Sequence, residues 1–181
     1  MQFFETRLKG AVRIELEKFP DHRGFFARTY CAEEFAAAGL ATQFVQANVS
    51  NNRAAGTLRG LHYQRAPHQE IKLVRCSRGS IHDVILDLRP TSPTYLQWEA
   101  FRLDAGSGTQ LYIPAGFAHG YQTLEPDTEV TYLVSCAHEP ASEAGIRHDD
   151  LRFRFVWPLP VADMSEKDRS WTNWTENPDK G

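Results

Sequence analysis

The stretch Ile113-Pro114-Ala115-Gly116-Phe117-Ala118-His119-Gly120 places a proline and a glycine between two short apolar segments. Proline presets the backbone for a turn, and glycine adopts turn conformations that other residues avoid. The strand-like segment 110–113 ends at this turn, and His119 follows Gly116 by three residues. The stretch therefore predicts two short strands joined by a tight turn, with a histidine on the second strand.

The same organisation extends over most of the chain. Short strand-like segments alternate with turns rich in Gly, Pro, Asn and Asp, which is typical of a β-sandwich or barrel. Residues 33–38 form the one clear short helix, ended by Gly39, and residues 165–168 resemble a capped helical turn. We expect an all-β sandwich or barrel in a single domain, 1–181, with a few short helices mainly near the C-terminus. The expected strands are 12–16, 25–31, 44–50, 71–76, 81–88, 97–103, 110–113 and 129–136, with a turn at 20–24 and a loop at 51–56.

The composition limits the classes of protein to which the chain can belong. Its 181 residues suit one domain, and a hydrophobic content of 41% supplies material for a core. There are 20 basic and 23 acidic residues, and the formal charge of -3 argues against a general nucleic-acid-binding surface. No apolar run reaches membrane-spanning length, and the N-terminal segment lacks the apolar core of a signal peptide. We expect a cytoplasmic protein that binds neither nucleic acid nor membrane.

The cysteines give no sign of a disulfide framework. Cys31, Cys76 and Cys136 are odd in number and widely spaced, with no C-x-x-C pair that would indicate a zinc site. We expect three buried thiols.

The densest chemical signal is the stretch 57–64, in which Arg59 and His62 flank Gly60. On a regular strand, a spacing of three residues directs two side chains to opposite faces. A kink at Gly60 would instead bring both toward one cavity. The alternative is a histidine satisfied in the core and an arginine on the rim.

The spacing P-x-G-x-x-H at 114–119 is that of the second conserved motif of the cupin barrels, in which the turn directs the histidine inward. Metal-binding cupins also carry a His-x-His pair, but the corresponding residues here, 62–64, contain one histidine, and Lys72 stands where a ligand is expected. A lysine repels a divalent cation, and two histidines do not complete a site. We therefore expect no metal and interpret His68 and Glu70 as surface loop residues.

Four side chains remain that support chemistry without a metal or cofactor: His62, Lys72, His119 and Tyr132. A histidine can abstract a proton near neutral pH, and a tyrosine can return one from another direction. An ammonium group and a second imidazole can stabilise an oxyanion. Together these groups suit deprotonation beside a carbonyl and reprotonation on the opposite face, which is an epimerisation.

Several further motifs, in order from about residue 12 to residue 168, resemble the dTDP-4-dehydrorhamnose 3,5-epimerase family of cupins. This resemblance implies a jelly-roll cupin barrel, a cofactor-independent isomerase, and a nucleoside-diphosphate 4-keto-6-deoxy sugar as substrate. It also implies a homodimer and a role in deoxysugar and polysaccharide biosynthesis. The stretches that carry the resemblance are 21–26, 46–48, 58–64, 72–76, 83–89, 92–94, 113–120, Tyr132, 142–146 and 165–168.

The resemblance also implies roles for individual residues. It assigns His62 as the general base, Asp168 as the carboxylate that orients it, and Tyr132 as the acid on the opposite face. Lys72 and His119 would surround the C4 oxygen of the sugar. The implied nucleotide and diphosphate contacts are Arg23, Arg59, Gln46, Asn48 and Glu143, and we include Lys167 among the substrate-binding residues.

Two positions depart from the family pattern. His138 stands where an aromatic residue commonly stacks on thymine, and Arg28 stands where a glutamate often helps to bind the nucleotide. Both belong to the expected nucleotide contacts, so the base could be thymine, cytosine or guanine. Family dimers exchange N-terminal strands, so Arg23 is expected to serve the site of the neighbouring subunit.

Three alternatives stay open at this point. One is an epimerase that acts at C3 or C5 alone on a CDP- or GDP-linked 4-keto sugar. Another is a metal-dependent cupin enzyme that uses His62 and His119. The third is a cupin that binds a sugar nucleotide without catalysis, against which the presence of both His62 and Tyr132 argues.

Overall fold

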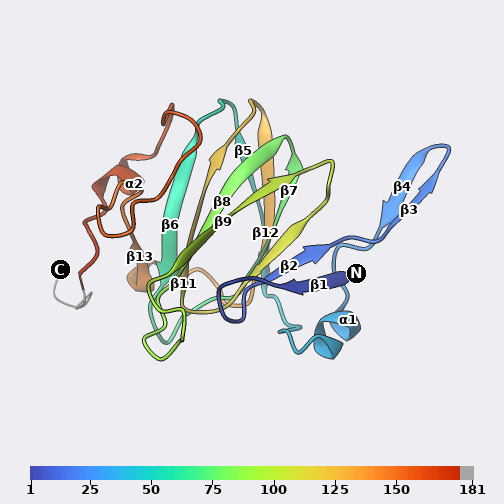
Figure 1. The fold of residues 1–181 in the computed structure, drawn as a ribbon, viewed down its shortest axis with the longest axis horizontal. Helices are drawn as coiled ribbons and strands as arrows, with labels where there is room; N and C mark the ends of the chain where they lie inside the picture. The colour runs from blue at the N-terminus through green and yellow to red at the C-terminus, as the bar shows by residue number, and fades with distance from the viewer. Residues whose placement is uncertain (176–181) are drawn as a thin grey trace.

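The computed structural model describes residues 1–175, so residues 176–181 of the predicted domain lie outside the described part. Its strands form two antiparallel sheets that face each other, and this confirms the predicted all-β sandwich (Figure 1). One sheet has the order β1 (Gln2–Glu5), β2 (Val12–Glu15), β10 (Gln110–Ile113), β7 (Lys72–Arg78), β12 (Thr128–Val134) and β5 (Gln46–Asn52). The other has the order β13 (Glu143–Gly145), β6 (Leu58–Gln64), β11 (Phe117–Thr123), β8 (Ser80–Asp87) and β9 (Trp98–Asp104).

Three short helical segments accompany the sheets in the described part. They are α1 (Ala32–Ala37), the 3-10 helix η1 (Pro140–Ser142) and α2 (Glu166–Ser170). Gly39 follows α1 with a positive φ and donates to Ala36 O, as its predicted role at the helix end requires. Ser165 caps α2 by accepting a hydrogen bond from the Asp168 N–H at 3.1 Å, which confirms the predicted capped turn. None of these helices is long and apolar enough to cross a membrane.

The hydrophobic core has a layer between the sheets and a further layer on the outer face of each. Strand β8 contributes to two of these layers, because its side chains are buried on both faces of the sheet. Ile81 and Ile85 pack between the sheets, while Val84 and Leu86 pack beneath the C-terminal segment. A strand buried on both faces tends to be apolar at consecutive positions, as Val84, Ile85 and Leu86 are here. The outer face of the other sheet is covered by α1 and its neighbours, with Phe35 at the centre.

The C-terminal segment is tied to the five-stranded sheet by hydrogen bonds rather than by a strand of its own. Gln122 exchanges two hydrogen bonds with the backbone of Leu159, at 2.8 and 3.0 Å. Leu58 N–H donates to Asp163 O at 2.9 Å, next to a parallel bridge between Thr57 and Asp163. These contacts hold the segment against the start of β6 and bring α2 beside that strand (Figure 1).

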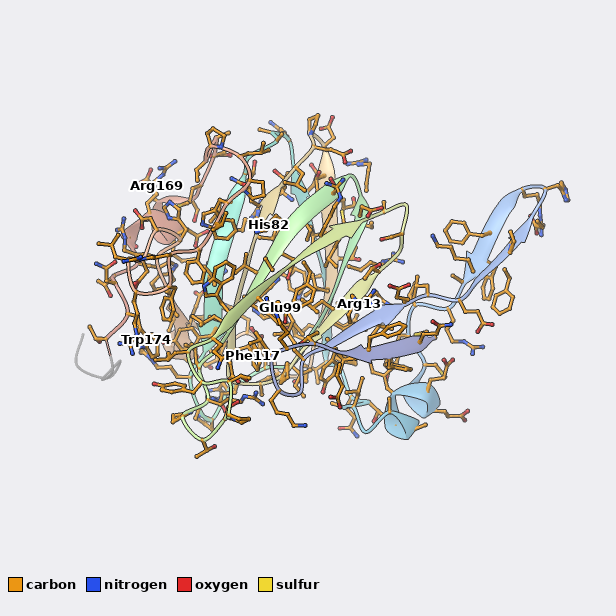
Figure 2. The ribbon with its side chains drawn as sticks, viewed as in Figure 1. Arg13, His82, Glu99, Phe117, Arg169 and Trp174 are labelled. Atoms are coloured by element: carbon orange, nitrogen blue, oxygen red, sulfur yellow. The ribbon has the colours of Figure 1, made fainter. Side chains whose placement is uncertain are left out.

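A separate hairpin, β3 (Lys18–Asp21) and β4 (Gly24–Ala27), extends away from the two sheets, as the ribbon with side chains shows (Figure 2). Phe19, Phe25 and Phe26 are 54%, 54% and 67% exposed. The hairpin therefore presents an exposed apolar patch, which is uncommon on the surface of a monomeric protein.

The structure corrects three local predictions. The loop predicted at 51–56 begins later, because Asn51 and Asn52 continue β5 by pairing with β12. The extended segment predicted to reach residue 31 ends at Ala27 as β4, since no strand lies beside the residues that follow. Of the three cysteines, Cys76 is buried, whereas Cys31 and Cys136 are partly exposed; all three are free. Burial raises the pKa of the Cys76 thiol to about 11.

The predicted kink at Gly60 is present as a β-bulge between β6 and β11. His62 pairs with His119 and Arg59 pairs with Tyr121, so three steps along β6 match two steps along β11. An extra residue in one strand shifts the alternation of its side chains by one position. Arg59 and His62, which regular pairing would place on opposite faces, consequently line one cavity.

Two glycines make this bulge possible. Gly60 has a φ of 106°, and a Cβ atom there would lie 2.6 Å from His119 O. A Cβ atom on Gly120 would lie 2.8 Å from Arg59 O. The backbones of β6 and β11 are therefore so close at this point that neither Gly60 nor Gly120 could carry a Cβ atom without a clash.

We expect Gly60→Ala to lower the free energy of unfolding by about 3 kcal/mol, because it combines an unfavourable φ with overpacking against backbone. Gly39→Ala is the matched control, since Gly39 also has a positive φ but nothing within 4 Å of a Cβ atom. Its expected cost is about 1 kcal/mol. Urea unfolding of the two variants measures the difference, and equal losses would contradict the close approach at the bulge.

Candidate active site

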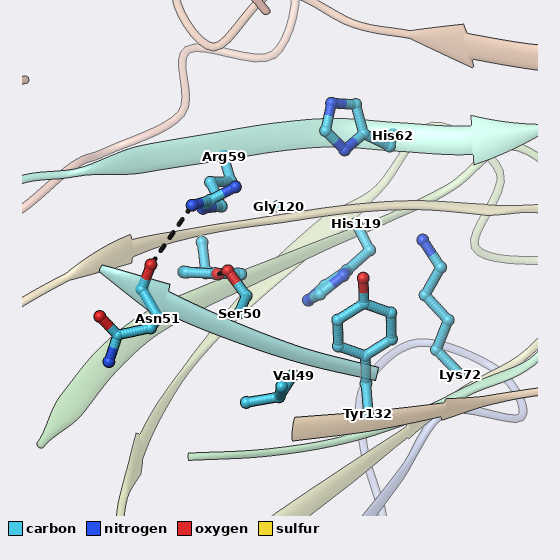
Figure 3. A pocket seen from close by; sticks show the side chains of 10 residues that line it. Val49, Ser50, Asn51, Arg59, His62, Lys72, His119, Gly120 and Tyr132 are labelled. Atoms are coloured by element: carbon cyan, nitrogen blue, oxygen red, sulfur yellow. Dashed lines mark hydrogen bonds between the residues drawn. The ribbon is translucent and has the colours of Figure 1, made fainter. Parts of the chain in front are cut away.

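A cavity of about 350 Å³ lies between the two sheets and collects five of the predicted site residues. Arg59 and His62 come from β6, Lys72 from β7, His119 from β11 and Tyr132 from β12. Figure 3 shows these side chains directed into one space from both sheets. The remaining lining residues are Val49, Ser50, Asn51, Gly120 and Tyr121.

His62 is held by a carboxylate from the C-terminal segment. Its Nε2 lies 2.5 Å from Asp168 Oδ1, and Asp168 Oδ2 accepts the Gly60 N–H at 3.3 Å. The Asp168 side chain is 3% exposed. Because Nε2 is engaged with Asp168, Nδ1 is the ring nitrogen of His62 left to act as a base.

The Asp168 carboxyl is ionised at neutral pH. Burial alone would raise its pKa, but the hydrogen bond and charge of His62, together with the N–H of Gly60 and the Ser165 hydroxyl, lower it below the ordinary aspartate value. An ionised carboxylate at Nε2 favours the tautomer with its proton on that nitrogen. It also stabilises the imidazolium that forms when Nδ1 takes up a proton.

His119 has a similar partner that sequence reasoning missed. Its Nε2 lies 2.8 Å from Oδ2 of Asp83, a fully buried residue of β8. Asp83 Oδ1 has no hydrogen-bond partner among the described residues. The available signal was a charged residue at an inward position between Ile81 and Ile85.

Lys72 forms an ion pair with Glu70 at 3.0 Å, and both side chains are largely buried. His68 and Glu70 both lie in the loop between β6 and β7, as predicted, but neither is fully exposed. Glu70 is largely buried against Lys72, and His68 Nδ1 lies 2.8 Å from Ser142 Oγ. An ammonium group has three donors, so one bond to Glu70 leaves donors for an oxygen in the cavity.

Tyr132 can supply a proton. Burial raises the pKa of its phenol, and the charge of Glu70 raises it further, although Arg59 acts in the opposite direction. The hydroxyl group is therefore neutral at pH 7 and can donate.

Five predicted contacts do not line this cavity. The His138 N–H donates to Gln46 Oε1 at 3.1 Å, and Lys167 Nζ donates to Glu143 Oε1 at 2.6 Å. Burial would raise the pKa of Glu143, but the hydrogen bond and charge of Lys167, together with the charges of His62 and His138, lower the pKa below its ordinary value. Asn48 lines a neighbouring cavity of about 330 Å³ that also contains Arg75 and Tyr132.

Arg23 and Arg28 do not line the cavity of their own chain. Arg23 lies in the turn of the projecting hairpin and forms an ion pair with Asp21 at 2.6 Å. Arg28 follows the hairpin and pairs with Glu34 at 3.1 Å. Both belong to the segment that leaves the body of the molecule. Within residues 1–175, no group of three or more His, Cys, Asp and Glu is arranged to hold a metal ion.

Comparison with known proteins gives full-length matches to one family. A family model described as dTDP-4-dehydrorhamnose 3,5-epimerase matches residues 5–176. The enzyme of that name from Methanothermobacter thermautotrophicus is 42% identical over 180 residues, covering 98% of this chain and 96% of that protein. The crystal structure of the Bacillus anthracis enzyme with TDP and PPi bound has a TM-score of 0.93 and 39% identity, covering 96% of this chain and 99% of that one. The Legionella pneumophila enzyme in complex with dTDP-4-keto-L-rhamnose has a TM-score of 0.89 and 34% identity, covering 95% and 92%.

The Asp168 carboxylate predicts a particular pH dependence of stability. Its folded-state pKa lies below the ordinary 3.8, so its contribution is complete above that value and is lost as the pH falls through the folded-state pKa. We expect Asp168→Asn to be less stable than wild type at pH 7, and the difference to narrow at about pH 3. Urea unfolding at both pH values tests this, with the exposed Asp163→Asn as the control. If Asp168→Asn lost the same free energy of unfolding relative to wild type at both pH values, this prediction would be contradicted.

Proposed function

This chain belongs to the dTDP-4-dehydrorhamnose 3,5-epimerase family, and we propose that it inverts C3, C5 or both centres of a dTDP-linked 4-keto-6-deoxyhexose through an enolate. The chain is accordingly an isomerase. The observation that carries the mechanism is the presence, in one cavity, of His62 held by Asp168 and of the neutral phenol Tyr132.

The first step is removal of a proton beside the keto group. The C4 carbonyl acidifies the hydrogens on C3 and C5, because the electrons of the broken C–H bond move onto the C4 oxygen. Nδ1 of His62 takes the proton, and the ionised Asp168 stabilises the resulting imidazolium at Nε2.

The second requirement is stabilisation of the enolate. Lys72 would donate toward the C4 oxygen from its ammonium group, and Glu70 holds it in place. His119 would donate from Nδ1 in its imidazolium form, with Asp83 accepting the proton on Nε2. Such donors act before the charge develops, so they need little reorganisation during the reaction. One preorganised donor typically contributes about 2.7–4 kcal/mol to the transition state.

The third step returns a proton to the opposite face of the carbon. Tyr132 comes from the sheet opposite that of His62 (Figure 3), and the sugar ring would bind between the two side chains. Its phenol gives a proton to carbon, while the enolate electrons re-form the carbonyl. Solvent then reprotonates the phenolate and takes the proton from His62, and the cycle consumes no cofactor or metal.

The nucleotide half of the substrate would extend from Arg59 toward Gln46, His138, Glu143 and Lys167. Arg59 suits the diphosphate because a guanidinium donates two parallel hydrogen bonds to one phosphate. The His138 N–H and the Gln46 side chain are already in contact, and so are Glu143 and Lys167. We assign the base-binding region to these four residues and Asn48.

The active species would be a cytoplasmic homodimer, with residues 1–181 as one domain. The projecting hairpin exposes three phenylalanines and carries Arg23 away from the cavity of its own chain. A second copy would cover these phenylalanines and receive Arg23, and Arg28 beside it, at its own nucleotide site.

We expect wild-type protein in deuterium oxide to exchange the C3 or C5 hydrogens of dTDP-4-keto-6-deoxyglucose, as followed by proton NMR. His62→Ala should slow the exchange by about 10²- to 10⁴-fold, since that is the usual contribution of a general base. His148→Ala, which replaces a histidine outside the cavity, is the matched control. No exchange by wild type would contradict this substrate and direct the same test to CDP- and GDP-linked keto sugars.

Tyr132→Phe should separate the two proton transfers. With His62 intact, deprotonation and its reversal continue, so deuterium still enters the substrate. Formation of the inverted sugar should fall by about 10²-fold or more, because the acid on the opposite face is missing. The ratio of deuterated starting material to epimer measures the effect, and an unchanged ratio would assign the acid to another group.

A further inference from the structure

Arg59 is the one cation-forming side chain of the cavity wall that has no carboxylate partner among the described residues. His62, His119 and Lys72 are each within 3.0 Å of a carboxylate oxygen. Arg59 instead donates from Nε to Asn52 Oδ1 at 2.7 Å, and from Nη2 to Asn51 O at 3.5 Å (Figure 3 shows the second contact). Both acceptors are uncharged, so the guanidinium is oriented without being neutralised.

Asn52 lies behind the cavity wall and is 2% exposed. Its amide nitrogen faces three acceptors: Thr128 O at 3.1 Å, Ser50 O at 3.3 Å and Tyr121 Oη at 3.4 Å. A flipped amide would place its oxygen against two carbonyl oxygens and its nitrogen against a guanidinium. The surroundings therefore allow one orientation, in which Oδ1 faces Arg59.

The hydrogen bond from Arg59 to Asn52 determines which edge of the guanidinium faces the cavity and is free to bind a ligand. A guanidinium can bind an oxyanion through Nε and Nη2 or through the two Nη atoms. Asn52 accepts the Nε–H and Asn51 O accepts one Nη2–H, so Nη1 and the second Nη2–H remain for a ligand. The bulge at Gly60 sets the Cα position of Arg59, and Asn52 sets the direction of its side chain.

The same network continues along the cavity wall. Tyr121 accepts from Asn52 and donates to Ser50 Oγ at 2.9 Å, and both Tyr121 and Ser50 line the cavity. Burial raises the pKa of the Tyr121 phenol, so the hydroxyl stays neutral and can serve as donor and acceptor together.

We propose that Asn52 is a positioning residue for substrate binding, which aims the unneutralised guanidinium of Arg59 at the diphosphate of the nucleotide sugar. The proposal rests on the proposed function, because it takes a nucleoside diphosphate as the ligand of Arg59. Asn52 acts through Arg59 and touches no reacting atom.

The test is a double-mutant cycle on dTDP affinity, measured by isothermal titration calorimetry. Asn52→Ala should raise the Kd for dTDP about tenfold, the usual loss for a hydrogen bond to a charged group. Arg59→Ala should raise it at least as much, and the double variant should match Arg59→Ala within about twofold. With substrate, Asn52→Ala should raise KM about tenfold and leave kcat within about threefold, because the diphosphate contact is the same before and during the reaction.

A structural role alone predicts a different pattern. Thr123→Val is the matched control, because the Thr123 side chain is also buried and hydrogen-bonded, but to the backbone of Thr57 and Ala54 and not to Arg59. It should leave the Kd for dTDP within about twofold. Asn52→Ser, which keeps a polar group beside Thr128 O but is shorter, is the second variant and should repeat the tenfold rise of Asn52→Ala.

Two results would overturn the proposal. One is an unchanged dTDP affinity in both Asn52 variants while Arg59→Ala binds more weakly. The other is an Asn52→Ala effect that adds in full to that of Arg59→Ala. If Arg59→Ala itself binds dTDP normally, the diphosphate contact fails and Asn52 with it, whereas deuterium exchange by wild type tests the epimerase function independently.

Discussion

The hydrogen bond between His62 and Asp168 joins two parts of the chain that are 106 residues apart, and the proposed chemistry depends on it. The bulge at Gly60 turns His62 toward the cavity, and the C-terminal segment must dock along β6 to deliver Asp168. Both features are needed. Without the docked C-terminal segment, the imidazole of His62 would lose the partner that fixes its orientation. Without the bulge, the side chain of His62 would not share a cavity with Arg59. The outer core layer and the Gln122 hydrogen bonds therefore serve the site as well as the fold.

Charge is distributed unevenly along the cavity wall. At the reacting end, His62, His119 and Lys72 each face a carboxylate, which holds the group in place and offsets the cost of burying it. At the other end, Arg59 keeps its full charge because its partners are amide and carbonyl oxygens. This arrangement suits a ligand with a neutral sugar and an anionic diphosphate, since the site has one end for each.

Much of the fold follows from local sequence patterns, because turn residues and strand-like segments are read over a few positions. The Pro114–Gly116 turn and the capped turn at Ser165 are of this kind, and the glycine between Arg59 and His62 indicated the bulge. Features that depend on pairing between distant strands were missed. Asn52 was predicted to lie in a loop, because its pairing with β12 is not visible in the local sequence. The roles of Asp83 and Glu70 depend on contacts with His119 and Lys72, which lie on strands β11 and β7. The position of Arg23 outside its own cavity was expected only from the resemblance to the family, because the path of the hairpin does not follow from its own residues.

The most direct test of the account is the tautomer of His62, measured by ¹⁵N NMR of histidine-labelled protein at a pH where the ring is neutral. The account predicts a proton on Nε2, donated to Asp168, and an unprotonated Nδ1 facing the cavity. Asp168→Asn should remove this preference, because an amide can accept from one tautomer or donate to the other. A wild-type ring with its proton on Nδ1 would contradict the account, since the cavity would then face a donor where it needs a base.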